Sequence, residues 1–72
     1  MDDLVNVLYD SKQRKYLGKE LTKEGGPTKV RNIKDARIFS DKEVSFAWET
    51  VYLCAWLEVG IFFVHGVERP GA

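Results

Sequence analysis

One stretch of the sequence, residues 40–60, has helix-capping residues at its ends and neither proline nor glycine in its interior. Ser40 is a favourable N-cap. Glu43, three residues later, completes a capping box, in which the serine hydroxyl and the glutamate carboxylate each accept a backbone N–H. Gly60 takes the left-handed conformation that ends many helices at little cost. The stretch therefore predicts one long helix from Ser40 to Gly60.

The predicted helix carries two apolar stripes. At about 100° of rotation per residue, the face expected to point into the core holds Val44, Ala47, Trp48, Val51, Cys54 and Ala55. The nearly opposite face holds Phe46, Leu53 and Leu57, where an ordinary surface helix is polar. Two interpretations are open, because large exposed apolar patches are uncommon on monomers. Either the N-terminal segment covers this second stripe, or the stripe binds a partner or a second copy of the chain.

Four shorter segments have the composition of β-strands: residues 4–9, 14–18, 29–33 and 61–67. The first alternates between two apolar faces, so it can be covered on both sides or serve as an edge that pairs with another protein. The Gly25-Gly26-Pro27 run predicts a break within a loop at residues 19–28. In the last segment Phe62 and Val64 share one face, and its branched and aromatic residues favour a central strand.

This order of elements, β-β-(β)-α-β, predicts an α+β fold. We expect a small antiparallel sheet of three to four strands with one long helix packed on a face. The 72 residues are enough for one domain, which we expect to span residues 1–72 with residues 69–72 as a frayed tail.

The charged residues are unevenly distributed although the net charge is zero. Residues 1–40 hold nine lysines and arginines against six aspartates and glutamates, a balance of +3, and residues 41–72 hold two against five, a balance of −3. The N-terminal hairpin is therefore the candidate surface for a nucleic acid, through Lys12, Arg14, Lys15 and Arg31. The alternative interpretation is a solvated basic loop.

The residues that carry chemistry are few. Cys54 is the one cysteine, which excludes a disulfide and suits a reducing compartment, and it lies on the predicted core face. His65 is the one histidine and has no second histidine with which to bind zinc. No two carboxylates form an acid–base pair on the predicted helix. We therefore expect a protein that is not an enzyme and needs no metal or cofactor.

The sequence favours a cytoplasmic location. Met1-Asp2-Asp3 is acidic where a signal peptide is basic. The apolar run at residues 51–67 is short for a membrane span and is interrupted by Glu58, Gly60 and His65. We expect no membrane association.

Three short motifs resemble those of very small bacteriophage proteins of β-β-α-β type. They are Tyr16-Leu17-Gly18, then Gly25-Gly26, and then the run of residues 35–43, Asp-Ala-Arg-Ile-Phe-Ser-Asp-Lys-Glu, that leads into the helix. The resemblance covers residues 16–50. That loose group includes regulators that bind a host enzyme, notably bacterial RNA polymerase, and redirect or inhibit transcription. The resemblance therefore implies a phage-encoded regulator in the host cytoplasm, and it assigns no binding residue to a position in this chain.

Taken together, these features favour a small protein-binding regulator. The predicted contacts are the N-terminal strand with the acidic Asp2–Asp3 tip, and the second helix stripe: Leu4, Val5, Tyr9, Phe46, Leu53 and Leu57. Two alternatives stay open. One is direct nucleic-acid binding by the basic hairpin, and the other is a homo-oligomeric structural protein whose second stripe is a symmetric interface.

Overall fold

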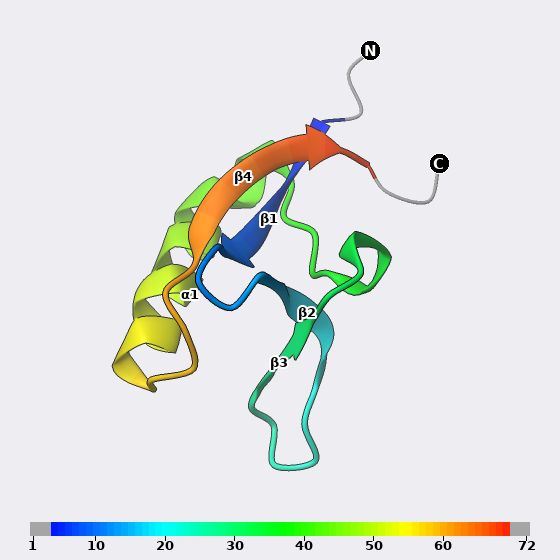
Figure 1. The fold of residues 1–72 in the computed structure, drawn as a ribbon. Coiled ribbons are helices and arrows are strands. Elements are labelled where there is room, and N and C mark those ends of the chain that lie inside the picture. Colours follow the sequence, from blue (N-terminus) through cyan, green and yellow to red (C-terminus); the bar gives the residue numbers. More distant parts are fainter. Residues whose placement is uncertain (1–3, 70–72) are drawn as a thin grey trace.

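The computed structural model of the chain describes residues 4–69 (Figure 1). In chain order its main elements are β1 (Leu4–Asp10), β2 (Lys15–Leu21), β3 (Pro27–Val30), α1 (Val44–Trp56) and β4 (Phe63–Glu68). Two single 3₁₀ turns lie at Ile33–Asp35 and Asp41–Glu43. The predicted Asp2–Asp3 tip and residues 70–72 of the predicted tail lie outside the described residues.

The four strands form one antiparallel sheet in the order β3-β2-β1-β4, and α1 lies along one side of it (Figure 1). This confirms the predicted α+β fold. Two strand positions differ from expectation. β1 is an interior strand, and β4 pairs with it along its whole length, from Leu4↔Glu68 to Tyr9↔Phe63, so β4 and not β1 is an edge. The branched and aromatic residues of β4 are typical of a strand with a buried face. This composition does not distinguish an edge strand from a central one.

The β1–β2 hairpin is paired only beside its turn, at Tyr9↔Tyr16 and Asp10↔Lys15. Beyond these pairs, residues 36–39 lie between the two strands. On one side, Asn6 and Phe39 exchange two backbone hydrogen bonds of 2.8 Å. On the other side, the Arg37 N–H donates to the Leu17 carbonyl at 2.9 Å. This inserted segment satisfies backbone groups that the separated strands would otherwise leave unpaired.

The β2–β3 hairpin is longer than predicted. β2 continues past Gly18 to Leu21, and β3 begins at Pro27 and ends at Val30. The reason is local, because Gly25 adopts a φ of 83° and reverses the chain within Thr22–Gly26. Pro27 is tolerated because β3 is an edge strand.

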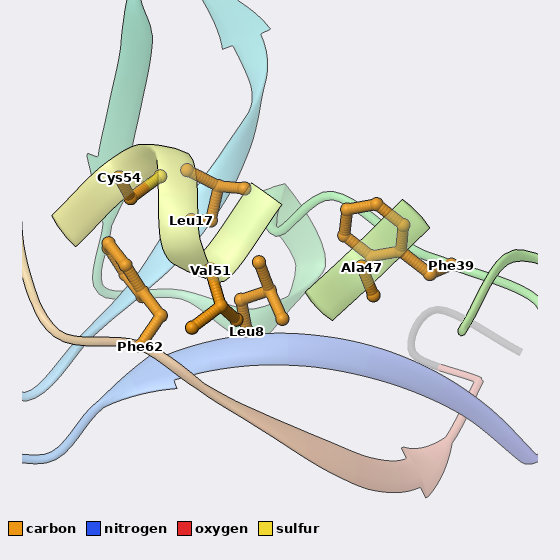
Figure 2. Close-up of a cluster of buried hydrophobic side chains, with 7 residues drawn as sticks. All are labelled: Leu8, Leu17, Phe39, Ala47, Val51, Cys54 and Phe62. Atoms are coloured by element: carbon orange, nitrogen blue, oxygen red, sulfur yellow. The ribbon is translucent and has the colours of Figure 1, made fainter. Parts of the chain in front are cut away.

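The core lies between α1 and the sheet (Figure 2). It contains Leu8, Leu17, Phe39, Ala47, Val51, Cys54 and Phe62. Val64 packs against this cluster, so the predicted shared face of Phe62 and Val64 is confirmed. Val5 and Val7, which alternate with Leu8, are also buried, so β1 is covered on both faces.

The helix buries a narrower stripe than predicted. Ala47, Val51 and Cys54 are buried, at the i, i+4, i+7 spacing of one helix face. The other expected core residues, Val44, Trp48 and Ala55, are exposed. The larger apolar side chains of the helix lie to either side of this buried line and are exposed.

The predicted capping box forms at Ser40, but α1 itself runs from Val44 to Trp56 and is shorter than predicted at both ends. The Ser40 N–H donates to Glu43 Oε1 at 2.9 Å, which is the glutamate half of the capping box, and Asp41–Glu43 form a 3₁₀ turn before α1. At the other end, Glu58 and not Gly60 adopts the left-handed conformation, with φ 60°. The N–H of Val59 donates to Cys54 O at 2.9 Å and that of Glu58 to Ala55 O at 3.1 Å, as in a Schellman motif.

Gly60 is required for a different reason, the close approach of Asp10. Asp10 is 2 % exposed, and its carboxylate accepts the N–H groups of Lys12 and Gln13 at 2.9 and 3.1 Å. It also accepts the Gln13 side-chain amide at 2.8 Å and the Ile61 N–H at 3.2 Å. A Cβ at Gly60 would lie 2.7 Å from Asp10 Oδ2. The carboxylate thus joins the β1–β2 turn to the loop between α1 and β4.

Replacing Glu58 with glycine should stabilise the protein. A non-glycine residue in the left-handed region costs about 1–2 kcal/mol, and part of the gain is offset by the greater freedom of glycine in the unfolded chain. We expect the free energy of unfolding in urea to rise by about 1 kcal/mol. The matched variant Gly60→Ala should instead lose about 1–3 kcal/mol, because its Cβ overpacks the Asp10 site. A loss of stability in Glu58→Gly as well as in Gly60→Ala would show that Gly60 and not Glu58 ends the helix.

Asp10 should make the protein sensitive to acid. Burial by itself would raise the pKa of Asp10, but the hydrogen bonds from Gln13, Lys12 and Ile61 outweigh it and hold the pKa below its ordinary value. A carboxylate with a lowered folded-state pKa contributes stability above the unfolded-state pKa, near pH 4, and loses it as the pH falls through the folded-state value. Urea unfolding should therefore show stability declining below about pH 4.

The variant Asp10→Asn should be less stable at pH 7 by about 2 kcal/mol, since an amide cannot accept all four hydrogen bonds. The stability of this variant should also fall much less in acid than the stability of the parent chain. Asp35→Asn, at an exposed position, is the control and should follow the parent chain. An acid profile unchanged by Asp10→Asn would assign the acid sensitivity to other carboxylates.

Candidate functional site

The second helix stripe is at the surface. Phe46, Leu53 and Leu57 are 46, 55 and 52 % exposed. Of the two interpretations of this stripe, coverage by the N-terminal segment does not hold for the described residues, because β1 lies in the middle of the sheet. The stripe is therefore apolar surface and not core.

These three side chains form one wall of an apolar groove of about 420 Å³. The opposite wall belongs to the β2–β3 hairpin, which contributes Leu17, Leu21, Gly25 and Pro27. Leu21, at the end of β2, is 63 % exposed. The groove exists because the β2–β3 hairpin diverges from β1 where residues 36–39 are inserted, and so it stands away from the helix (Figure 1).

Arg37 and Glu49 supply the charge in this groove. The Arg37 guanidinium lies 5.0 Å from the centre of the Phe39 ring and 5.2 Å from that of Phe46. The Phe39 and Phe46 rings are themselves 5.9 Å apart. This cation–π arrangement joins a buried ring to an exposed one and restrains the position of Phe46. The groove thus presents a fixed aromatic ring beside a positive charge.

A second exposed ridge lies on the other flank of α1. Trp48, Tyr52 and Trp56 recur every four residues and are 41, 70 and 84 % exposed. Sequence reasoning placed Trp48 in the core and gave Tyr52 and Trp56 no role. The signal was present, because aromatic residues at i, i+4 and i+8 share one side of a helix. Exposed tryptophan and tyrosine side chains are enriched among residues that carry binding energy in protein interfaces.

The three predicted contact residues of the N-terminal strand differ in how far their side chains are exposed. Leu4 is 59 % exposed, Tyr9 is half-buried, and Val5 is 2 % exposed. Val5 is therefore a core residue that cannot contact a partner in this fold. The physical reason is that β1 is paired on both sides and its middle, at Val5, Val7 and Leu8, is covered on both faces, whereas the prediction allowed it to be a free edge.

The four basic candidates lie at one end of the β1–β2–β3 unit. Lys12 and Arg14 belong to the exposed turn at residues 11–14, Lys15 is half-buried opposite Asp10, and Arg31 follows Val30, which is paired with Tyr16. Arg14 has a φ of 58°, which orients the end of the turn.

The nearby Lys29 is not free for a ligand, because its Nζ donates to Gln13 Oε1 at 2.8 Å and to the Val59 carbonyl at 3.2 Å. It therefore holds the β2–β3 hairpin against the loop that follows α1.

Cys54 and His65, the two residues considered for chemistry from the sequence, have different surroundings. Cys54 is buried, and this burial raises the pKa of its thiol and so disfavours the reactive thiolate. His65 is exposed and its ring meets that of Tyr9 edge-on at 5.7 Å. Within residues 4–69, no three histidine, cysteine or carboxylate side chains gather where they could hold a metal ion. The described part of the chain also contains no helix of the length and apolar character needed to span a membrane.

Comparison of the chain with models of known protein families, with curated proteins and with solved structures found no match.

Proposed function

We propose that this protein is a non-enzymatic binding module that captures an apolar segment of a larger protein in the groove between α1 and the β2–β3 hairpin. The observation that carries the proposal is the groove itself. It is lined by Phe46, Leu53 and Leu57 on the helix and by Leu21 and Pro27 on the hairpin. Exposed apolar grooves rimmed by polar side chains mark sites of interaction on protein surfaces.

The chemistry of the groove describes the partner segment. Its two walls are a helix and a hairpin, so it accepts an elongated segment, as in the binding of an amphipathic helix by an apolar groove. The segment would insert apolar side chains between Leu53 and Leu21, with a polar or acidic side chain near Arg37. The Trp48–Tyr52–Trp56 ridge would extend the contact area around the helix.

The resemblance to small phage regulators supports a particular class of partner. A phage-encoded protein of this kind would act in the host cytoplasm on a large host enzyme such as bacterial RNA polymerase, and would modulate or inhibit transcription. The groove is compatible with this role and does not select the enzyme.

The first test is capture of a partner from nuclease-treated bacterial lysate with the tagged protein. The same capture is done with the double variant Phe46→Gln/Leu53→Gln. Both positions are about half exposed, so the variant should fold, which circular dichroism and thermal unfolding check. A partner recovered in stoichiometric amount by the parent chain and absent with the double variant supports the proposal. Identification by mass spectrometry then shows whether it is a polymerase.

With the purified partner, the double variant should bind at least about tenfold more weakly, because central apolar contacts typically cost more than 1 kcal/mol each when removed. Ile61→Gln is the matched control, since Ile61 is 58 % exposed and lies outside the groove. Equal binding by the parent and the double variant would reject the groove as the site. A mass in sedimentation that rises with protein concentration, and falls back in the double variant, would assign the stripe to self-association instead.

A further inference from the structure

An aromatic row crosses the sheet on the face turned away from α1. Phe63, Tyr9 and Tyr16 are successive partners on β4, β1 and β2, and Val30 on β3 continues the row. Directly paired residues of antiparallel strands project to the same face of a sheet. Leu8, which precedes Tyr9, belongs to the helix-side core, so the row projects to the opposite side.

The rings of this row are accessible and held in place. Phe63 is 52 % exposed, and Tyr9 and Tyr16 are half-buried with ring centres 4.8 Å apart. His65 is exposed on the same face, and its ring meets Tyr9 edge-on at 5.7 Å. Three adjacent strands therefore present four rings on one surface, with Tyr9 packed against both Tyr16 and His65.

Charged side chains of both signs lie around the row. The row lies at the turn end of the sheet, where Arg14 is exposed in the turn and Arg31 follows Val30. Lys12 instead lines a hollow with Ala55 and Glu58 on the helix side. The carboxylate closest in sequence, Asp10, lies on the helix side and is occupied by N–H groups of Gln13 and Ile61. It therefore does not face the row. The carboxylates beside the row are Glu20 and Asp35, which line a hollow with Val30 on the β3 side.

We infer that this aromatic row and its basic end bind single-stranded nucleic acid. Bases stack on exposed aromatic rings, and a groove or edge rich in lysine and arginine follows the phosphates. A duplex is disfavoured because α1 carries Glu49 and neither lysine nor arginine, so it cannot serve as a recognition helix. The row lies on the other side of the sheet from the proposed protein-binding groove, so the two sites are independent.

The test is the fluorescence anisotropy of a labelled oligo(dT) and oligo(U) of about 12 nucleotides, a length within the range of such sites. The parent chain should bind the single strands more tightly than a duplex of equal length. Phe63→Ala should weaken binding by about tenfold, the effect typical of one stacked base. Phe63→Trp should retain binding, which would show that the ring and not the fold is responsible.

The double variant Arg14→Gln/Arg31→Gln tests the charge. The slope of log affinity against log salt should fall by about 1.4, because each phosphate that the protein no longer neutralises lowers it by about 0.7. Leu53→Ala is the matched control, because Leu53 is 55 % exposed on the helix side. It should leave nucleic-acid affinity unchanged, so that failure of this inference is distinguishable from failure of the protein-binding proposal.

Two results would overturn the inference. The first is the absence of binding at low salt. The second is binding that Phe63→Ala leaves intact and that heparin, a polyanion without bases, displaces as well as an unlabelled oligonucleotide does. That second pattern would show that the surface attracts polyanions through charge alone and does not stack bases.

Discussion

The insertion of residues 36–39 between β1 and β2 is the interaction on which the rest of the structure depends. It converts a short hairpin into two diverging strands, each hydrogen-bonded to the inserted segment. It places Phe39 in the core and Arg37 against the exposed Phe46 ring. Because β2 is thereby turned away from β1, the β2–β3 hairpin extends past the helix and leaves the groove between them.

A single short helix cannot cover all the apolar surface that this chain offers. Its buried line consists of Ala47, Val51 and Cys54, and the larger side chains lie on both flanks. The groove stripe occupies one flank and the tryptophan ridge the other. The sheet has a third accessible apolar surface in its aromatic row. The protein thus has a small core and several exposed apolar or aromatic surfaces, and the proposed binding function rests on these surfaces.

Sequence periodicity predicted the features that depend on neighbouring residues. Alternation placed Phe62 and Val64 on one shared face, helical spacing identified the second stripe, and Glu43 occupies its predicted position in the capping box. The features it missed depend on tertiary contacts. Nothing local distinguishes Gly60, which gives room to Asp10, from a helix-ending glycine, and nothing local indicates that Glu58 takes the left-handed conformation instead.

The residues of the candidate sites, like the elements of the fold, were predicted only in part. Phe46, Leu53 and Leu57 were identified because helical spacing alone places them on a different face from the core residues. Val5 was misassigned, since the number of partners of β1 depends on where β4 and residues 36–39 arrive. The aromatic row was not predicted, because it requires the register between three strands. No pattern within one strand contains that information.

The pairing of β1 with β4 also has a consequence for the order in which the chain can fold. Leu4 lies opposite Glu68, so this contact closes a loop that contains nearly all of the described chain. The other neighbour of β1, residues 36–39, also arrives late. β1 precedes both partners in the chain, so during synthesis it is exposed, with two apolar faces, before either partner can pair with it. Before β4 and residues 36–39 pair with it, β1 has free edges that can pair with a strand of another molecule.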